Sequence, residues 1–178
     1  MAAEGAGVAV RDLTRALPRF GGVRRRQELR GVASGVRVYD DFAHHPTAVA
    51  ETLRALASRH SGGKLIAIFE PRSSTAARKL HQAQSAEAFA AADVTLLAPV
   101  GRPEIPDAER LDVGAIAEEI RASGRAAEAP PSTAAIIDRV AALARPGDTV
   151  VAMSNGAFDQ IHDKLLARLA VATLESRL

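Results

Sequence analysis

The sequence predicts an α/β domain with a Rossmann-like, mostly parallel sheet, helices on both faces and a preceding β-hairpin. Continuous apolar runs, typical of buried strands, alternate with segments in which apolar residues recur at helical spacing. A chain of 178 residues, 47% of them hydrophobic, is long enough to bury one sizeable core. Right-handed crossovers between parallel strands then place helices on both faces of the sheet.

The first 20 residues predict one helix and a connector. Val8, Val10, Leu13 and Leu17 make a short apolar face, and Pro18 ends it. This piece is too short to be a domain.

The segment QELRGVASGVRVYDDF predicts the β-hairpin, with arms at residues 29–33 and 36–39 and a turn at Ser34-Gly35. Later strands are expected at 64–70, 93–99, 125–128 and 148–154. Helical stripes between or after them are formed by Val49, Leu53 and Leu56, by an alanine-rich segment (76–92) with Leu80 and Phe89, by Val113, Ile116 and Ile120, by Ile136, Val140 and Leu143, and by Phe158, Ile161, Leu165 and Leu169. Three prolines predict a surface loop at 99–110.

Composition excludes several classes of protein. The absence of cysteine excludes disulfides, thiolate catalysis and cysteine-ligated metals. Scarce aromatic residues argue against stacking on nucleic-acid bases, and the sequence has no phosphate loop, G-x-S-x-G elbow or H-E-x-x-H motif. No signal-peptide pattern and no apolar run of membrane-spanning length is present, so a soluble, cytoplasmic protein is expected.

Basic residues cluster at Arg24, Arg25, Arg26 and Arg30, although the net charge is only +2. Two interpretations stay open. The cluster is either a solvated arginine run or an anion site, with phosphate as the favoured anion.

Three polar clusters follow predicted strands: DDFAHHP, EPRSST and SNGAF. In open α/β sheets ligands gather beyond the carboxyl ends of the strands, so these clusters are expected to converge. Asp40 and Asp41 alternate across the strand end and therefore face opposite sides. An outward carboxylate there could accept hydrogen bonds from a ribose diol; helix capping and a metal site are the alternatives.

The other two clusters favour a ligand with a negative charge. Arg72 and three hydroxyls precede a predicted helix, which suits a carboxylate or phosphate; ordinary Ser/Thr capping is the alternative that stays open. Ser154 and Asn155 can cap the last helix, and Gly156 allows a ligand to approach the backbone. His60, His81 and His162 are interpreted as surface or packing residues.

Taken together, GVRRRQELRG, YDDFAHHPTAV, FEPRSST, ARPGDTVVAMSNGAF and IHDKLL resemble the C-terminal domain of the Mur ligase family over about residues 20–170. These ATP-dependent ligases join amino acids or peptides to UDP-N-acetylmuramate in cell-wall synthesis. DDFAHHP fits the family's D-[YF]-x-H-x-P pattern. The motifs are most similar to members that attach the tripeptide L-Ala-γ-D-Glu-meso-diaminopimelate in peptidoglycan recycling. Members that add L-alanine, usually with DDYGHHP, come next.

The resemblance implies a domain organisation. Residues 1–20 would be a remnant of the central ATPase domain and linker, 21–171 the C-terminal domain, and 172–178 a tail. The chain would then be a fragment, inactive alone, that closes over ATP and receives the peptide. Its implied partners are UDP-N-acetylmuramate, the murein tripeptide and the first two domains of the same polypeptide, with no nucleic acid and no membrane. Ligands for Mg²⁺ are expected in the missing domains and none in this chain.

Site residues carry over from the resemblance. Arg26 matches the catalytic arginine that reaches the ATP phosphates, Asp41 the ribose carboxylate, and His44 the family histidine near the nucleotide. Asp41 is accordingly expected to project outward from the rim of the sheet. The expected peptide-binding residues are Arg72, Ser154, Asn155, Gly156 and Phe158. Gln27 departs from the usual apolar residue between that arginine and Glu28.

Two further hypotheses belong to other functional classes. One is a stand-alone Rossmann-like binding module without catalysis. The other is a small metal-dependent hydrolase that uses Asp40, Asp41, His44 and His45.

Overall fold

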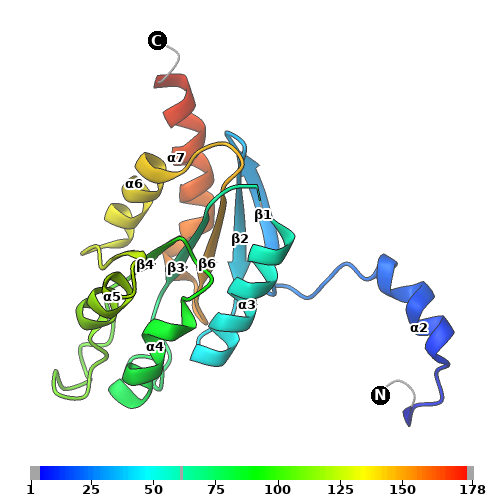
Figure 1. Ribbon diagram of the computed structural model, residues 1–178, viewed down its shortest axis with the longest axis horizontal. Coiled ribbons are helices and arrows are strands. Elements are labelled where there is room, and N and C mark those ends of the chain that lie inside the picture. The colour runs from blue at the N-terminus through cyan, green and yellow to red at the C-terminus, as the bar shows by residue number, and fades with distance from the viewer. Residues whose placement is uncertain (1–4, 61, 176–178) are drawn as a thin grey trace.

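A computed structural model describes residues 5–60 and 62–175, and its centre is a six-stranded sheet (Figure 1). The strands are β1 (Glu28–Ala33), β2 (Val36–Asp41), β3 (Leu65–Phe69), β4 (Val94–Leu97), β5 (Ala126–Glu128) and β6 (Thr149–Met153). Their spatial order is β1-β2-β6-β3-β4-β5. The β1–β2 pair is antiparallel and all other pairs are parallel, which confirms the predicted fold class.

Helices cover both faces of this sheet (Figure 1). One face carries α3 (Pro46–Arg59), α4 (Gln82–Ala88) and α5 (Val113–Ala122). The other carries α6 (Thr133–Leu143) and α7 (Ile161–Glu175), with a short 3-10 turn, η3 (Phe158–Gln160), before α7. Because β3, β4 and β6 are buried on both faces, their side chains alternate between two separate hydrophobic layers.

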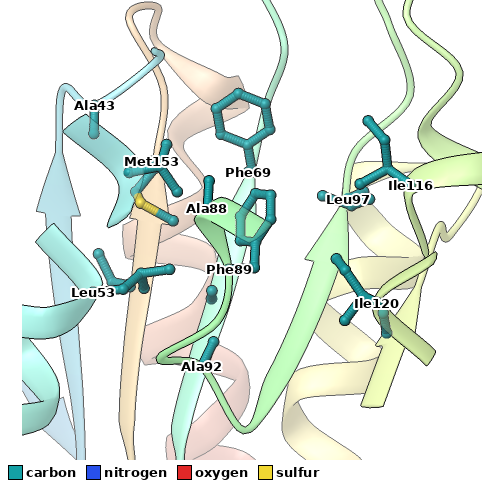
Figure 2. Packing of buried hydrophobic residues seen from close by; sticks show 14 of the residues in the cluster. Ala43, Leu53, Phe69, Ala88, Phe89, Ala92, Leu97, Ile116, Ile120 and Met153 are labelled. Carbon is teal, nitrogen blue, oxygen red and sulfur yellow. The ribbon is translucent and has the colours of Figure 1, made fainter. Parts of the chain in front are cut away.

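The layer under α3, α4 and α5 is built around two aromatic rings (Figure 2). Phe69 and Phe89 meet edge to face with ring centroids 5.8 Å apart. Met153 and Leu53 lie on one side of these rings, and Leu97 lies on the other (Figure 2). These contacts fix the ends of β3 and β6, from which two of the polar clusters emerge.

The hairpin forms as its sequence predicts. Ser34 (φ 54°) and Gly35 (φ 77°) both adopt the left-handed conformation that a two-residue turn of the primed type requires. In β1, the first arm of the hairpin, Gly31 lies against α7, and a Cβ added there would be 3.0 Å from Leu166. The hairpin therefore docks closely on the last helix.

The prediction of a continuous helix at 76–92 is wrong. Residues 77–79 instead pair with the segment before α5, through Lys79 N–H to Glu109 O (2.8 Å) and Leu111 N–H to Ala77 O (2.9 Å). Helical structure is limited to η2 (Lys79–His81) and α4. Leu80, expected on the apolar stripe, is 68% exposed. A long-range backbone pairing thus overrides the local alanine-rich pattern.

The N-terminal piece contains α2 (Val10–Ala16) and a 3-10 turn, η1 (Leu17–Arg19), in which Pro18 falls. None of the residues of α2 or η1 is buried, and α2 lies apart from the sheet in Figure 1. Residues 1–4 of the expected remnant lie outside the described residues. At the other end α7 continues to Glu175, into the expected tail, and residues 176–178 are likewise outside. No helix in the described ranges has the length and apolarity needed to cross a bilayer.

Candidate functional site

The three polar clusters converge, as predicted, at the carboxyl edge of β2, β6 and β3. These strands are neighbours in the sheet, so the segments after them lie side by side. Ser154 N–H donates to Asp41 O (3.0 Å), and Glu70 N–H donates to Met153 O (3.0 Å). The Ser154 hydroxyl also donates to the Glu70 carboxylate. The edge is therefore one connected surface.

Asp41 does not project outward as expected, because its carboxylate turns into the chain. Its Oδ2 accepts from Gln27 N–H (2.8 Å), and its Oδ1 accepts from Ala43 N–H (2.8 Å) and from the Thr52 hydroxyl (3.2 Å). The residue is 2% exposed. Three donors from separate segments reach this position, and a buried carboxylate satisfies all of them. Asp41 thus joins β2 to α3 and to the turn before β1.

Asp40 points to the opposite face of the sheet, as the strand alternation predicts. Its carboxylate lies 3.3 Å from Arg25 Nε, 3.8 Å from Arg30 Nη1 and 3.4 Å from His162 Nε2. The histidine contact is close but not aligned as a hydrogen bond, since the buried Nε2 has no hydrogen-bond partner among the described residues. Because the two aspartates diverge, they cannot share one metal ion. No cluster of metal-ligating side chains is found in the described part of the chain.

The turn formed by residues 23–27, here called the arginine turn, displays Arg26 at the surface. Arg25 (φ 55°) and Gln27 (φ 47°) flank it in the left-handed conformation, which is energetically unfavourable for residues other than glycine. The guanidinium of Arg26 lies 5.5 Å from the centroid of the Phe42 ring. Within residues 5–60 and 62–175 no carboxylate pairs with Arg26. Its charge is therefore available to an anion.

His44 is half-buried and meets the ring of Phe42 edge to face, with ring centroids 5.4 Å apart; Phe42 in turn contacts the arginine turn. The Nδ1 of His44 is 2.9 Å from Phe42 O, and because a carbonyl oxygen only accepts, Nδ1 donates this hydrogen bond. Its neighbour His45 caps α3 instead, accepting from Thr47 N–H at 3.3 Å. The two adjacent histidines thus have different surroundings, and His44 is the one connected to the arginine turn, through Phe42.

Arg72 and the loop after β6 form the second half of the edge. Arg72 is exposed and lies 3.7 Å from Glu70 through Nη1. Its side chain crosses Gly156 so closely that an added Cβ would lie 2.1 Å from Arg72 Cδ. Asn155 contributes a buried Oδ1 without a hydrogen-bond partner among the described residues. This half therefore presents an exposed guanidinium whose stem packs against the backbone of Gly156.

Phe158 must be reassigned from the site to the core. Its side chain is 1% exposed and packs in the layer between the sheet and helices α6 and α7. Its left-handed backbone (φ 43°) turns the ring inward at the start of α7. Helical spacing in the sequence grouped Phe158 with Ile161, Leu165 and Leu169. The four residues do share one apolar layer, but Phe158 lies in η3, before α7 begins.

Two residues of the edge escaped sequence reasoning. Arg25 was one of several clustered arginines, and its contacts with the loop after β6 depend on tertiary structure. Glu70 follows a buried strand directly and bonds Ser154. A carboxylate at the end of a buried strand was the available signal for Glu70.

Residues 25–156 match the protein family described as "Mur ligase, glutamate ligase domain". The chain belongs to the Mur ligase family. The matched region contains all three polar clusters up to Gly156, so the resemblance seen in the motifs is confirmed and the chain carries the C-terminal domain of a Mur ligase.

Individual Mur ligases are similar over most of the chain. The UDP-N-acetylmuramate–L-alanyl-gamma-D-glutamyl-meso-2,6-diaminoheptandioate ligase of Escherichia coli is 42% identical over 171 residues, covering 95% of this chain and 35% of the relative. The UDP-N-acetylmuramate–L-alanine ligase of Rubrobacter xylanophilus is 36% identical, covering 89% of this chain and 36% of the relative. A crystal structure of a murein peptide ligase from Psychrobacter arcticus superimposes with a TM-score of 0.71 at 34% identity, over 95% of this chain and 35% of that one. The chain thus spans about a third of the length of these Mur ligases.

His162 gives this Mur ligase domain a predicted pH dependence. Burial lowers its pKa from the ordinary value of 6.5, the charges of Arg30 and Arg25 lower it further, and the charge of Asp40 opposes the shift. Below pH 6.5 the unfolded chain therefore binds a proton that the folded chain does not. The free energy of unfolding should fall as the pH drops through this range, and His162→Leu should flatten the slope. Urea unfolding of the wild type and of His162→Leu at several pH values between 7.5 and 5 measures this pH dependence. The same slope of free energy against pH in the two proteins would contradict the prediction.

Proposed function

We propose that this chain is the C-terminal domain of a cytoplasmic, ATP-dependent ligase. The ligase would join the tripeptide L-Ala-γ-D-Glu-meso-diaminopimelate to UDP-N-acetylmuramate during peptidoglycan recycling. One observation carries the proposal: a Mur ligase domain presents on one half of its carboxyl edge Arg26, which has no carboxylate partner among the described residues, and on the other half Arg72, packed against Gly156. The choice of tripeptide rests on the 42% identity to the E. coli enzyme with that substrate in its name.

The half around the arginine turn is assigned to the nucleotide. Arg26 would approach the ATP phosphates, since an exposed guanidinium binds phosphate oxygens in a bidentate manner. His44 would lie near the nucleotide, with its ring oriented by the hydrogen bond from Nδ1 to Phe42 O. Asp41 would support this half indirectly. Its carboxylate accepts the Gln27 N–H and so holds the arginine turn in place.

The half around the loop after β6 is assigned to the peptide. Arg72 would pair with a carboxylate of this acidic tripeptide. Ser154, Asn155 and Gly156 would supply polar groups, and Gly156, which has no Cβ, lets the Arg72 side chain cross the loop closely. The peptide amine would thereby be held near the phosphate side of the edge.

The chemistry needs charge neutralisation and positioning more than a nucleophile from the protein. ATP phosphorylates the muramoyl carboxylate, the peptide amine attacks the acyl phosphate, and phosphate leaves. Arg26 would offset negative charge on the phosphates, while the peptide half orients the amine. The Mg²⁺ ligands and the phosphate loop would come from the other domains of the enzyme.

A chimera tests this function. The segment of the E. coli ligase that aligns with this chain is replaced by the chain, and ADP release is measured with UDP-N-acetylmuramate and ATP. Release that depends on the tripeptide supports the proposal. Release that depends instead on L-alanine would favour the alternative activity, that of the L-alanine ligases. A folded chimera that releases no ADP with either the tripeptide or L-alanine would contradict both ligase activities and favour a binding module.

Gly156→Ala tests the peptide half separately. The added methyl would collide with Arg72 Cδ, and since Arg72 is an exposed, flexible side chain, it should move rather than unfold the domain. We expect the KM for the tripeptide to rise about tenfold, the equivalent of about 1.4 kcal/mol, with the KM for ATP unchanged. Gly101→Ala is the matched control, because nothing lies within 4 Å of an added Cβ there. An unchanged peptide KM would remove Arg72 and Gly156 from the peptide site.

A further inference from the structure

The side chain of Arg25 connects the two halves of the carboxyl edge. Its Nη2 donates to Ser154 O at 2.6 Å and to Gly156 O at 2.8 Å, both in the loop after β6. Its Nε lies 3.3 Å from Asp40 Oδ2, which orients the planar guanidinium. One side chain thus connects the loop after β6 to the arginine turn.

The backbone of Arg25 fixes the turn as well. Arg25 N–H donates to Glu28 Oε2 (2.7 Å), and Arg25 O accepts from Phe42 N–H (2.8 Å). Because Arg25 itself has a left-handed backbone, such bonds from outside the turn are needed to hold it. Arg26 follows directly, so its position depends on the same contacts.

Building on the proposed function, we infer that Arg25 is a positioning residue that couples nucleotide binding to peptide binding. Its Nε and Nη2 donors are bonded within the chain, so the role assigned here needs no contact with either substrate. Instead it keeps the arginine turn and the 154–156 loop in a single relative arrangement. A lysine would retain the charge but lacks the planar fork that bonds two carbonyls and a carboxylate together. Arg25→Lys therefore separates charge from positioning.

Kinetics of the chimera test the coupling. For Arg25→Lys we expect kcat/KM to fall about tenfold or more for both ATP and the tripeptide, since an ammonium cannot keep both bonds to the loop after β6 together with the contact to Asp40. Arg30→Lys is the matched control: Arg30 lies 3.8 Å from the same Asp40 carboxylate and makes no hydrogen bond to the 154–156 loop among the described contacts. Its kinetic constants should stay within about twofold of the wild type. Wild-type kinetics in Arg25→Lys, or a loss confined to one substrate, would overturn the coupling.

Hydrogen exchange on this chain by itself tests the same inference without ligase activity. Amides at 154–158 and 23–28 should exchange faster in Arg25→Lys, while those in β3 and β4 keep the wild-type rate. Unchanged exchange at 154–158 would overturn the positioning role, and so would acceleration throughout the sheet, which marks a general loss of stability. If the wild-type chimera is inactive the proposed function fails, whereas the exchange data still decide the role of Arg25.

Discussion

Replacing Arg26 by alanine should lower the turnover number of the active chimera by about 100-fold or more. The guanidinium is exposed and has no carboxylate partner among the described residues, so its charge is available to the developing negative charge on ATP. Removing a preorganised donor of this kind typically has an effect of that size. The free energy of unfolding should change by less than about 0.5 kcal/mol, since no buried contact is lost. Steady-state ADP release and urea unfolding measure the two quantities.

Arg59→Ala is the control for this prediction. Arg59 is also an exposed arginine, but it lies at the last position of α3, away from the carboxyl edge. Its removal should leave turnover unchanged. Equal activities of the Arg26 and Arg59 variants would show that the arginine turn does not serve the reaction.

Asp41→Ala should destabilise the domain by about 3 kcal/mol. The substitution leaves Gln27 N–H, Ala43 N–H and the Thr52 hydroxyl without their acceptor in a region that is mostly buried. Unsatisfied buried donors are costly, and here three are created at once. Since Gln27 belongs to the arginine turn, ligase activity should fall in the same variant. Chemical denaturation of this chain gives the stability, and the chimera gives the activity.

Asp107→Ala separates this effect from a simple change of charge. The Asp107 side chain is 91% exposed and pairs with Arg110 on the surface, so its removal should change stability by less than about 0.5 kcal/mol. If Asp41→Ala were as stable as the wild type, the three hydrogen bonds would not hold the turn. If it were destabilised but fully active at a permissive temperature, the arginine turn would not need Asp41.

Most of the sheet could be predicted because its signals are local. Each buried parallel strand is a continuous apolar run, and the Ser34-Gly35 turn has the residues that a tight hairpin favours. The segment 76–92 shows the limit of such signals. Its alanine content favours a helix, yet the backbone of Ala77 and Lys79 bonds to residues more than 29 positions later in the chain.

The sequence by itself determined the order of strands and helices, the family, and the three polar clusters at the carboxyl edge. These follow from periodicity and from motifs, which are properties of short stretches of chain. Tertiary structure alone decided that Asp41 turns inward, that Phe158 belongs to the core, and that Arg25 bridges the halves of the site. The physical reason is that hydrogen bonds satisfy whichever groups folding brings together, and a carboxylate or guanidinium takes its role from partners distant in sequence.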